Sequence, residues 1–152
     1  MATRPIPEGY HSVTPYLIVT GAASAIEFYK HAFGAKELMR IPHPDGRVGH
    51  AELQIGDSRI MLGDEFPEIG ARSPMSLGGT PVGIQLYVDD VDAYFSELKS
   101  RGVAIERDIE DQDYGCRDFD IRDFDISPDG REIVVERVQE RSDVVLLDLP
   151  RE

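Results

Sequence analysis

Two segments of the chain share one pattern, in which a short alternating strand runs directly into an amphipathic helix. Over residues 83–88, aliphatic residues alternate with Gly83, Gln85 and Tyr87, which is typical of a half-buried β-strand. Residues 90–101 carry apolar side chains three and four positions apart. This spacing predicts a helix with one buried face.

The same pattern occurs earlier in the chain. It predicts a strand over residues 13–19 and a helix over residues 22–33. When Val19 is aligned with Val88, the apolar positions of the two helices coincide. The chain therefore contains a tandem repeat of one module.

Each helix is followed by three more predicted strands. The pattern places them at residues 35–41, 48–55 and 58–62, then at 103–109 and in a final hairpin whose return arm is 132–138. The sequence thus predicts an α+β fold of two tandem β-α-β-β-β modules. The expected parts are an irregular lead-in at 1–11, module one at 12–66, a Gly- and Pro-rich linker at 67–82, module two at 83–138, and a C-terminal tail at 139–152.

The first arm of the final hairpin contains an identical pentapeptide twice, at residues 117–121 and 122–126. Because five is odd, the second copy points its side chains to the opposite face from the first. We therefore expect a β-bulge there, or one copy in the strand and the other in a loop.

The charge of the chain excludes one class of partner. The net charge is −13, with 29 acidic residues against 16 Lys and Arg, whereas nucleic-acid binding needs clustered cations. No apolar run reaches the roughly 18 residues of a membrane span, and the first residues have no signal-peptide character. A lone Cys116 excludes an internal disulfide. We therefore expect a cytoplasmic protein with neither nucleic acid nor membrane as a partner.

Several short phrases are similar to those of a known family. They are VTPYL at 13–17, EFYKHAFG at 27–34, GHAEL at 49–53, IMLGDE at 60–65, YVDDVD at 87–92 and SPDG at 127–130. With the repeated module, they resemble the vicinal oxygen chelate superfamily of glyoxalase I, extradiol dioxygenases and the fosfomycin and bleomycin resistance proteins, and within it the PhnB-like branch. The resemblance implies that the modules form an open, cleft-containing mixed β-barrel with the helices outside.

In metal-bearing members of this superfamily, the first and last strands of each module supply the ligands. The matching positions here are Thr14 and Met61 in module one, and Gly83 and Val134 in module two. Divalent ions prefer carboxylate, imidazole or thiolate groups, and none of the four residues offers one. We therefore predict that the inherited metal site is absent and expect no cofactor. A divalent ion at a different site stays open as an alternative.

Side chains that share a face with these positions predict the lining of a ligand-binding cleft, because side chains alternate along a strand. The lining mixes aromatic, amide and charged groups, which suits a polar or aromatic small molecule. It consists of Thr14, Tyr16, Ile18, His50, Glu52, Gln54, Arg59, Met61, Gly83, Gln85, Tyr87, Glu132, Val134 and Glu136. The opposite face is almost entirely aliphatic and is predicted to lie under the helices.

His50 and Glu52 are the candidate catalytic residues. Two positions apart on one strand face, they can act on a common ligand atom or anchor a proton relay. Two other interpretations stay open: a rim histidine with a structural contact between Glu52 and Arg59, and a new metal site completed by a third group. Tyr16 and Tyr87 are candidates to stack on an aromatic ligand, with an ordinary half-buried pair as the alternative.

The sequence therefore predicts a small-molecule-binding protein without the inherited metal site. The alternative is a glyoxalase-like lyase/isomerase or a dioxygenase that uses His50 and Glu52 or a non-inherited metal site, and a structural dimer module is a third hypothesis. The resemblance also implies a homodimer. The apolar stretch at 144–149 is a candidate for that contact or for packing on its own chain.

Overall fold

A computed structural model describes residues 5–122 of the chain and the backbone of residues 132–138. Module one consists of β1 (Tyr16–Val19), α1 (Ala22–Phe33), β2 (Lys36–Pro42), β3 (Val48–Ile55) and β4 (Ser58–Asp64). Module two consists of β5 (Ile84–Tyr87), α3 (Val91–Ser100), β6 (Ile105–Asp111), β7 (Cys116–Arg122) and β8 (Glu132–Val138). The first pentapeptide copy lies within β7. The second copy beyond residue 122, the turn at 128–130 and the tail lie outside the described residues.

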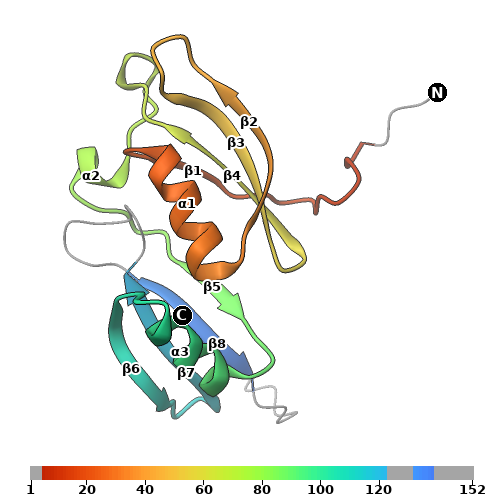
Figure 1. Ribbon diagram of the computed structural model, residues 1–152, viewed down its shortest axis with the longest axis vertical. Coiled ribbons are helices and arrows are strands. Elements are labelled where there is room, and N and C mark those ends of the chain that lie inside the picture. The colour runs from red at the N-terminus through yellow and green to blue at the C-terminus, as the bar shows by residue number, and fades with distance from the viewer. Residues whose placement is uncertain (1–4, 123–131, 139–152) are drawn as a thin grey trace, which may run out of the picture.

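Each module forms its own four-stranded sheet, and the two sheets have the same topology (Figure 1). The strand orders are β1-β4-β3-β2 and β5-β8-β7-β6. In each sheet the first strand pairs in parallel with the last, and the remaining pairs are antiparallel. Neither sheet closes on itself. The structure therefore confirms the predicted α+β class and the repeated β-α-β-β-β module.

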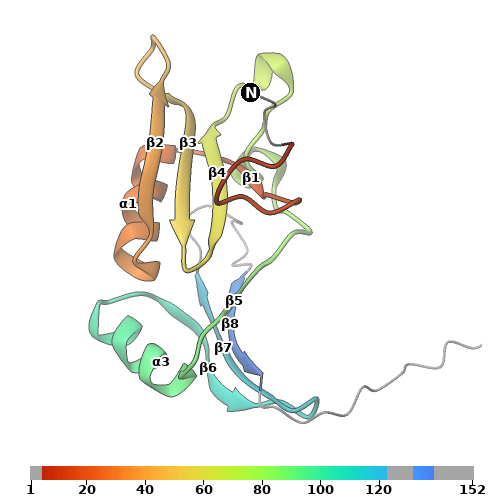
Figure 2. The same cartoon turned by 90° about the vertical axis from the view of Figure 1, so that its right-hand side faces the viewer.

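The core lies between each helix and one face of its sheet, as the alternating pattern predicts. In module one, Tyr29 and Ile26 of α1 are buried with Leu53 and Leu62 of the sheet. In module two, the Phe119 side chain of β7 is fully buried, and its ring centroid lies 4.9 Å from that of Phe95 on α3. Figure 2 shows both helices on the same side of the two sheets. The opposite face of each sheet is not covered by these helices.

A buried carboxylate fixes the start of α1. Asp64, the last residue of β4, accepts hydrogen bonds from the backbone N–H groups of Gly21 and Ala22 at 2.9 and 2.8 Å. Its second oxygen accepts from the N–H of Val48 at 2.7 Å, at the start of β3. One side chain thus joins three elements and satisfies helix N–H groups that have no partner within the helix.

The linker is more ordered than its composition predicts. It contains a 3₁₀ turn, η1 (Pro67–Ile69), and a short helix, α2 (Pro74–Leu77). Ser73 caps α2 by accepting from the N–H of Ser76, and the Ser73 and Thr20 hydroxyls lie 2.8 Å apart. Such local side-chain hydrogen bonds order a segment that has no apolar periodicity.

The two modules lie end to end (Figure 2) and contact each other at the C-terminal ends of α1 and α3. The His31 ring nitrogen Nε2 lies 2.9 Å from the carbonyl oxygen of Arg101, and the Arg101 guanidinium donates to the carbonyl oxygen of His31 at 2.8 Å. Within the described part of the chain, every helix falls short of the length and apolar content that crossing a membrane requires.

Candidate functional site

The outer face of the module-one sheet brings most of its predicted cleft residues together. Tyr16 pairs with Met61, and Met61 with Glu52, so these three residues lie side by side across β1, β4 and β3. His50 and Arg59 lie beside them on the same face and are half-buried. The face combines an imidazole, a carboxylate, a guanidinium and a phenol, as the alternation predicts. Gln54 lies at its edge, where its amide donates to the carbonyl oxygen of Gly56 at 3.1 Å.

His50 lies between a phenol and a carboxylate. Its Nδ1 is 3.1 Å from the Tyr16 hydroxyl, and its Nε2 is 3.4 Å from Oε1 of Glu52. The His50 and Tyr16 rings are tilted at 34° with centroids 5.5 Å apart. The His50 and Glu52 side chains retain 22% and 15% of their exposure, so a ligand can reach them. Both ring nitrogens therefore have a partner suited to proton exchange.

A residue of the irregular lead-in completes this group, and sequence reasoning missed it. The Tyr10 hydroxyl donates a hydrogen bond to Oε2 of Glu52. The Arg59 guanidinium lies over the Tyr10 ring, 4.2 Å from its centroid. The hydrogen bond from Tyr10 is the main cause that lowers the pKa of Glu52. Burial opposes this shift, and the hydrogen bond from His50 adds to it. The pKa of Tyr10 is raised, mainly by burial and next by its hydrogen bond to Glu52.

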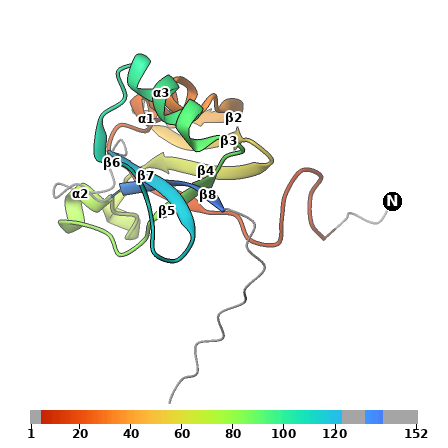
Figure 3. The ribbon, with the colours of Figure 1, turned by 90° about the horizontal axis from the view of Figure 1, so that it is seen from below.

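The lead-in lies on the side of the module-one sheet that faces away from α1, as Figures 2 and 3 show. A hollow of about 660 Å³ separates it from the sheet. The walls of the hollow include Tyr10 on one side and Thr14, Glu52, Arg59 and Met61 on the other. Four predicted cleft residues therefore line one concavity, and a segment without periodicity forms its roof.

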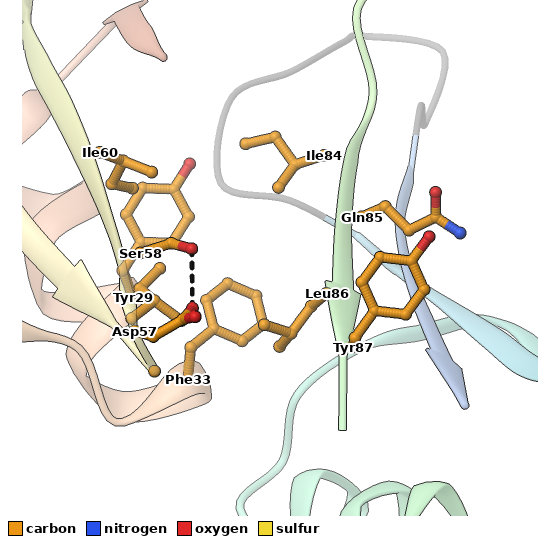
Figure 4. A pocket seen from close by; sticks show the side chains of 11 residues that line it. Tyr29, Phe33, Asp57, Ser58, Ile60, Ile84, Gln85, Leu86 and Tyr87 are labelled. Atoms are coloured by element: carbon orange, nitrogen blue, oxygen red, sulfur yellow. Dashed lines mark hydrogen bonds between the residues drawn. The ribbon is translucent and has the colours of Figure 1, made fainter. Parts of the chain in front are cut away.

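Among the described side chains, those predicted for module two do not line this hollow. Gln85 and Tyr87 line a separate cavity of about 190 Å³ between the modules. In Figure 4, Ile84 and Leu86 of β5 point toward Tyr29 and Phe33 of α1, whereas Gln85 and Tyr87 point to the other side of the strand.

Tyr16 lies apart from Tyr87, because it contacts His50 and lines a third hollow beneath the linker. The described residues of one chain therefore do not form the predicted aromatic pair. The remaining predicted residues, Glu132, Val134 and Glu136, lie on β8, whose backbone alone is described. Val134 is paired with Gln85, and Glu136 with Tyr87.

Module two carries a charged cluster that the sequence analysis also missed. Asp120 pairs with Val134 and Val134 with Gln85, so Asp120 occupies the place that Glu52 has in module one. Asp118 correspondingly takes the place of His50. Both carboxylates are buried, at 1% exposure for Asp118 and 4% for Asp120. The alternation within the first pentapeptide copy could have identified them, since its Phe and Ile are the core residues.

Arg107 of β6 hydrogen-bonds both carboxylates of this buried pair. Its Nε donates to Asp120 at 2.7 Å, and its Nη2 donates to Asp118 at 2.9 Å. Gln112 and Tyr114 also donate to Asp118, at 2.7 and 3.0 Å. Burial raises the pKa of Asp118, but these hydrogen bonds outweigh it and leave the pKa below its ordinary value. The cluster is a satisfied ion network within the sheet.

The resemblance matches Thr14, Met61, Gly83 and Val134 to the positions of the metal ligands in relatives. Thr14 lies at the edge of the module-one hollow, Met61 on its floor, and Gly83 immediately before β5. Among the residues that the structure describes, no three His, Cys, Asp or Glu side chains are grouped so that they could hold a metal ion. His50 and Glu52 supply two such groups, and the polar side chains beside them are Tyr10, Tyr16 and Arg59.

Comparison with known proteins identifies the family. The family model of the Glyoxalase/Bleomycin resistance protein/Dioxygenase superfamily matches residues 9–133. This chain belongs to that superfamily, as its repeated module and its short phrases predict. Uncharacterized proteins of Mycobacterium bovis and Mycobacterium tuberculosis are 41% identical to it over 109 residues. The match covers 70% of this chain, 72% of the M. bovis protein and 64% of the M. tuberculosis protein.

Solved structures share the fold. A glyoxalase/bleomycin resistance protein/dioxygenase from Nocardioides has a TM-score of 0.68 at 17% identity, over 97% of this chain and 92% of that one. TioX from Micromonospora has a TM-score of 0.59 at 22% identity, over 88% of this chain and 100% of that one. The fosfomycin resistance protein FosX of Listeria monocytogenes, complexed with Mn(II) and sulfate, has a TM-score of 0.58 at 16% identity, over 86% and 93%.

Proposed function

We propose that this protein binds a polar or aromatic small molecule on the outer face of the module-one sheet, without the metal-ligand set of its superfamily. The observation that carries the proposal is the convergence of Tyr16, His50, Glu52 and Arg59 on one partly exposed sheet face. Glu52 and Arg59 of this group also line the hollow beneath the lead-in. A concave site with a few convergent polar groups is the usual form of a small-molecule site. The phrases quoted from the sequence favour the PhnB-like branch.

Ligand binding is tested by a thermal-shift screen of polar and aromatic compounds, followed by calorimetric titration of the compounds that raise Tm. We expect Glu52→Gln and Arg59→Ala to weaken binding at least about tenfold, because each removes a charge that faces the ligand. Glu68→Gln, on the exposed turn η1, is the matched control and should bind as the wild type does. Equal affinities in all four proteins would contradict the proposed site.

The metal-free part of the proposal has a separate test. Elemental analysis of protein purified without chelator should find less than stoichiometric Zn, Ni, Mn and Fe. FosX is known in complex with Mn(II), so the fold itself is compatible with a divalent ion. In this chain Thr14, Met61 and Gly83 stand at three of the four matching positions, and they supply no carboxylate, imidazole or thiolate. A tightly bound stoichiometric ion would refute this part and direct attention to His50 and Glu52.

A second candidate function is proton transfer by a glyoxalase-like lyase/isomerase or a dioxygenase. The geometry that favours it is the chain of contacts from Tyr16 through His50 to Glu52, with 3.1 and 3.4 Å between successive polar atoms. An imidazole held between a phenol and a carboxylate can accept a proton from one side and pass it to the other. Turnover by His50→Ala and Glu52→Ala at the wild-type rate would remove both residues from such a mechanism.

We further propose a homodimer in which a second copy supplies the other half of the ligand site. Tyr16 and Tyr87, predicted to line one cleft, are 47% and 60% exposed and line different hollows within one chain. A partner that packs its module-two face against module one would bring the two sets together. Light scattering after size exclusion should give twice the chain mass of 17.0 kDa. A monomer that binds ligand at full affinity would contradict this arrangement.

A further inference from the structure

The Tyr10 side chain occupies the proposed ligand site in the manner of a ligand. It comes from a segment without helix or strand, and it meets the sheet through its ring and its hydroxyl. We propose that Tyr10 is a built-in occupant of this site, and that the ligand which displaces it is an uncharged aromatic ring bearing a hydroxyl group. This inference rests on the proposed function and names the chemical class of its ligand.

The ring subsite is defined by Arg59. Its guanidinium lies over the face of the Tyr10 ring at 4.2 Å from the centroid, a cation–π geometry that any electron-rich planar ring can reproduce. Gly9 permits this approach. It has a φ of +79°, and a Cβ at that position would overlap the Arg59 guanidinium. The backbone beside Tyr10 is thus adapted to bring the ring onto Arg59.

The hydroxyl subsite is defined by Glu52, which accepts the hydrogen bond of the Tyr10 phenol. Its lowered pKa keeps it ionised at neutral pH, so it can accept a hydrogen bond but cannot donate one. A ligand must therefore present an O–H or N–H donor at the far edge of its ring. An anionic group at that edge would be repelled by the carboxylate, which disfavours benzoates and aryl sulfates.

The attachment of Tyr10 is suited to displacement. The lead-in from Pro5 to Ser12 is largely exposed, and its internal backbone contact is a single turn from the Tyr10 N–H to the Pro7 carbonyl oxygen at 3.2 Å. The hollow between the lead-in and the sheet gives a ligand room to enter. Because a ligand must displace Tyr10, its observed affinity is its affinity for the open site multiplied by the fraction of molecules in which the site is open. Ligand binding is then coupled to release of the lead-in from the sheet.

The test uses p-cresol, which has the atoms of a tyrosine side chain, and toluene, which lacks the hydroxyl. We expect Tyr10→Ala to bind p-cresol about tenfold more tightly than the wild type, because the competing side chain is gone. Tyr10→Phe, which keeps the ring over Arg59 but not the hydrogen bond, should lie between the two. Tyr94→Phe removes a phenol on α3 whose hydroxyl donates to the carbonyl oxygen of Ala32, away from the outer sheet face, and should match the wild type. Titration calorimetry of the four proteins, each spanning residues 1–152, measures all four affinities.

Two further measurements decide where p-cresol binds. Adding Glu52→Gln to Tyr10→Ala should weaken p-cresol at least about tenfold while leaving the weak binding of toluene unchanged. Saturating p-cresol should speed amide hydrogen exchange of residues 5–12 in the wild type to the rate seen in Tyr10→Ala. Both results would support Tyr10 as the displaced occupant.

The inference and the proposed function fail in different ways. If Tyr10→Ala gains no affinity for p-cresol, or binds toluene equally well, the inference is overturned. Binding of another compound that depends on Glu52 and Arg59 would then leave the proposed function intact. If no compound of the wider screen binds the wild type or Tyr10→Ala, both fail together.

Discussion

Replacing Arg107 should lower the free energy of unfolding, because the two buried aspartates of module two would lose their cation. Arg107 is the cation that hydrogen-bonds both Asp118 and Asp120, whose side chains are 2% and 5% exposed. Removing one partner of a buried ion pair typically costs about 3–5 kcal/mol, because a buried charge is left without compensation. The Arg107 side chain itself is 31% exposed, so solvent screens part of the interaction. We expect Arg107→Ala to lower the free energy of unfolding by about 2–4 kcal/mol at pH 7.

The pH dependence of the lost unfolding free energy shows whether the loss comes from the missing charge of Arg107 or from its missing packing contacts. In the wild type the pKa of Asp118 lies below its ordinary value, so its contribution to stability is present above about pH 4 and is lost as the pH falls through the lower folded value. In Arg107→Ala the same carboxylate is buried without its cation, which raises its folded pKa and favours protonation. The difference in unfolding free energy between the two proteins should therefore shrink from pH 7 to pH 4.

Urea unfolding followed by circular dichroism at both pH values measures the effect. Arg40→Ala is the matched control, because Arg40 lies on β2 and pairs with the partly exposed Glu37 at 2.8 Å. It should cost about 1 kcal/mol or less. Adding Asp118→Asn and Asp120→Asn to Arg107→Ala should recover most of the loss at pH 7. A loss that is the same at pH 7 and pH 4, or no larger than that of Arg40→Ala, would refute the reasoning.

Four further predictions concern the fold and the lead-in. Asp64→Ala leaves three backbone N–H groups without their acceptor and should cost about 3 kcal/mol in urea unfolding, with Asp64→Asn losing less. Phe119→Ala empties a fully buried site and should cost about 3–5 kcal/mol in the same assay. Gly34→Ala strains a residue with φ of +62° and should lower stability by about 1 kcal/mol. The lead-in should lose its protection from hydrogen exchange in acid, as the pH falls through the lowered pKa of Glu52, because protonated Glu52 no longer attracts the Tyr10 hydroxyl as strongly; protection at pH 7 that Glu52→Gln leaves unchanged would contradict that contact.

The sequence predicted the repeated module because helix and strand patterns are local properties. The helix at residues 22–33 and the strand at 48–55 were predicted with the boundaries that the structure has. The boundaries of the first strand were predicted less well. Residues 13–15 lie outside β1, since Pro15 and the exposed Val13 precede the pairing with β4. Short edge strands carry little periodicity, so their ends depend on their neighbours.

The candidate site was predicted in part. His50, Glu52 and Arg59 share a face because the period of a strand is two, and this relation is visible in the sequence. Tyr10 was not predicted, because it lies 42 residues from Glu52 in a segment without any repeating pattern. Arg107 was missed for a related reason: its partners are 11 and 13 residues away across a β-bulged pair of strands.

By itself, the sequence determined the two modules and the sheet face that packs against each helix. These properties follow from residue type and local spacing. Tertiary structure alone decided that Tyr10 covers Glu52, that Arg107 bridges Asp118 and Asp120, and that Tyr16 and Tyr87 line different hollows. The physical reason is that such contacts depend on how distant segments approach one another, and side-chain alternation specifies a face without specifying what lies against it.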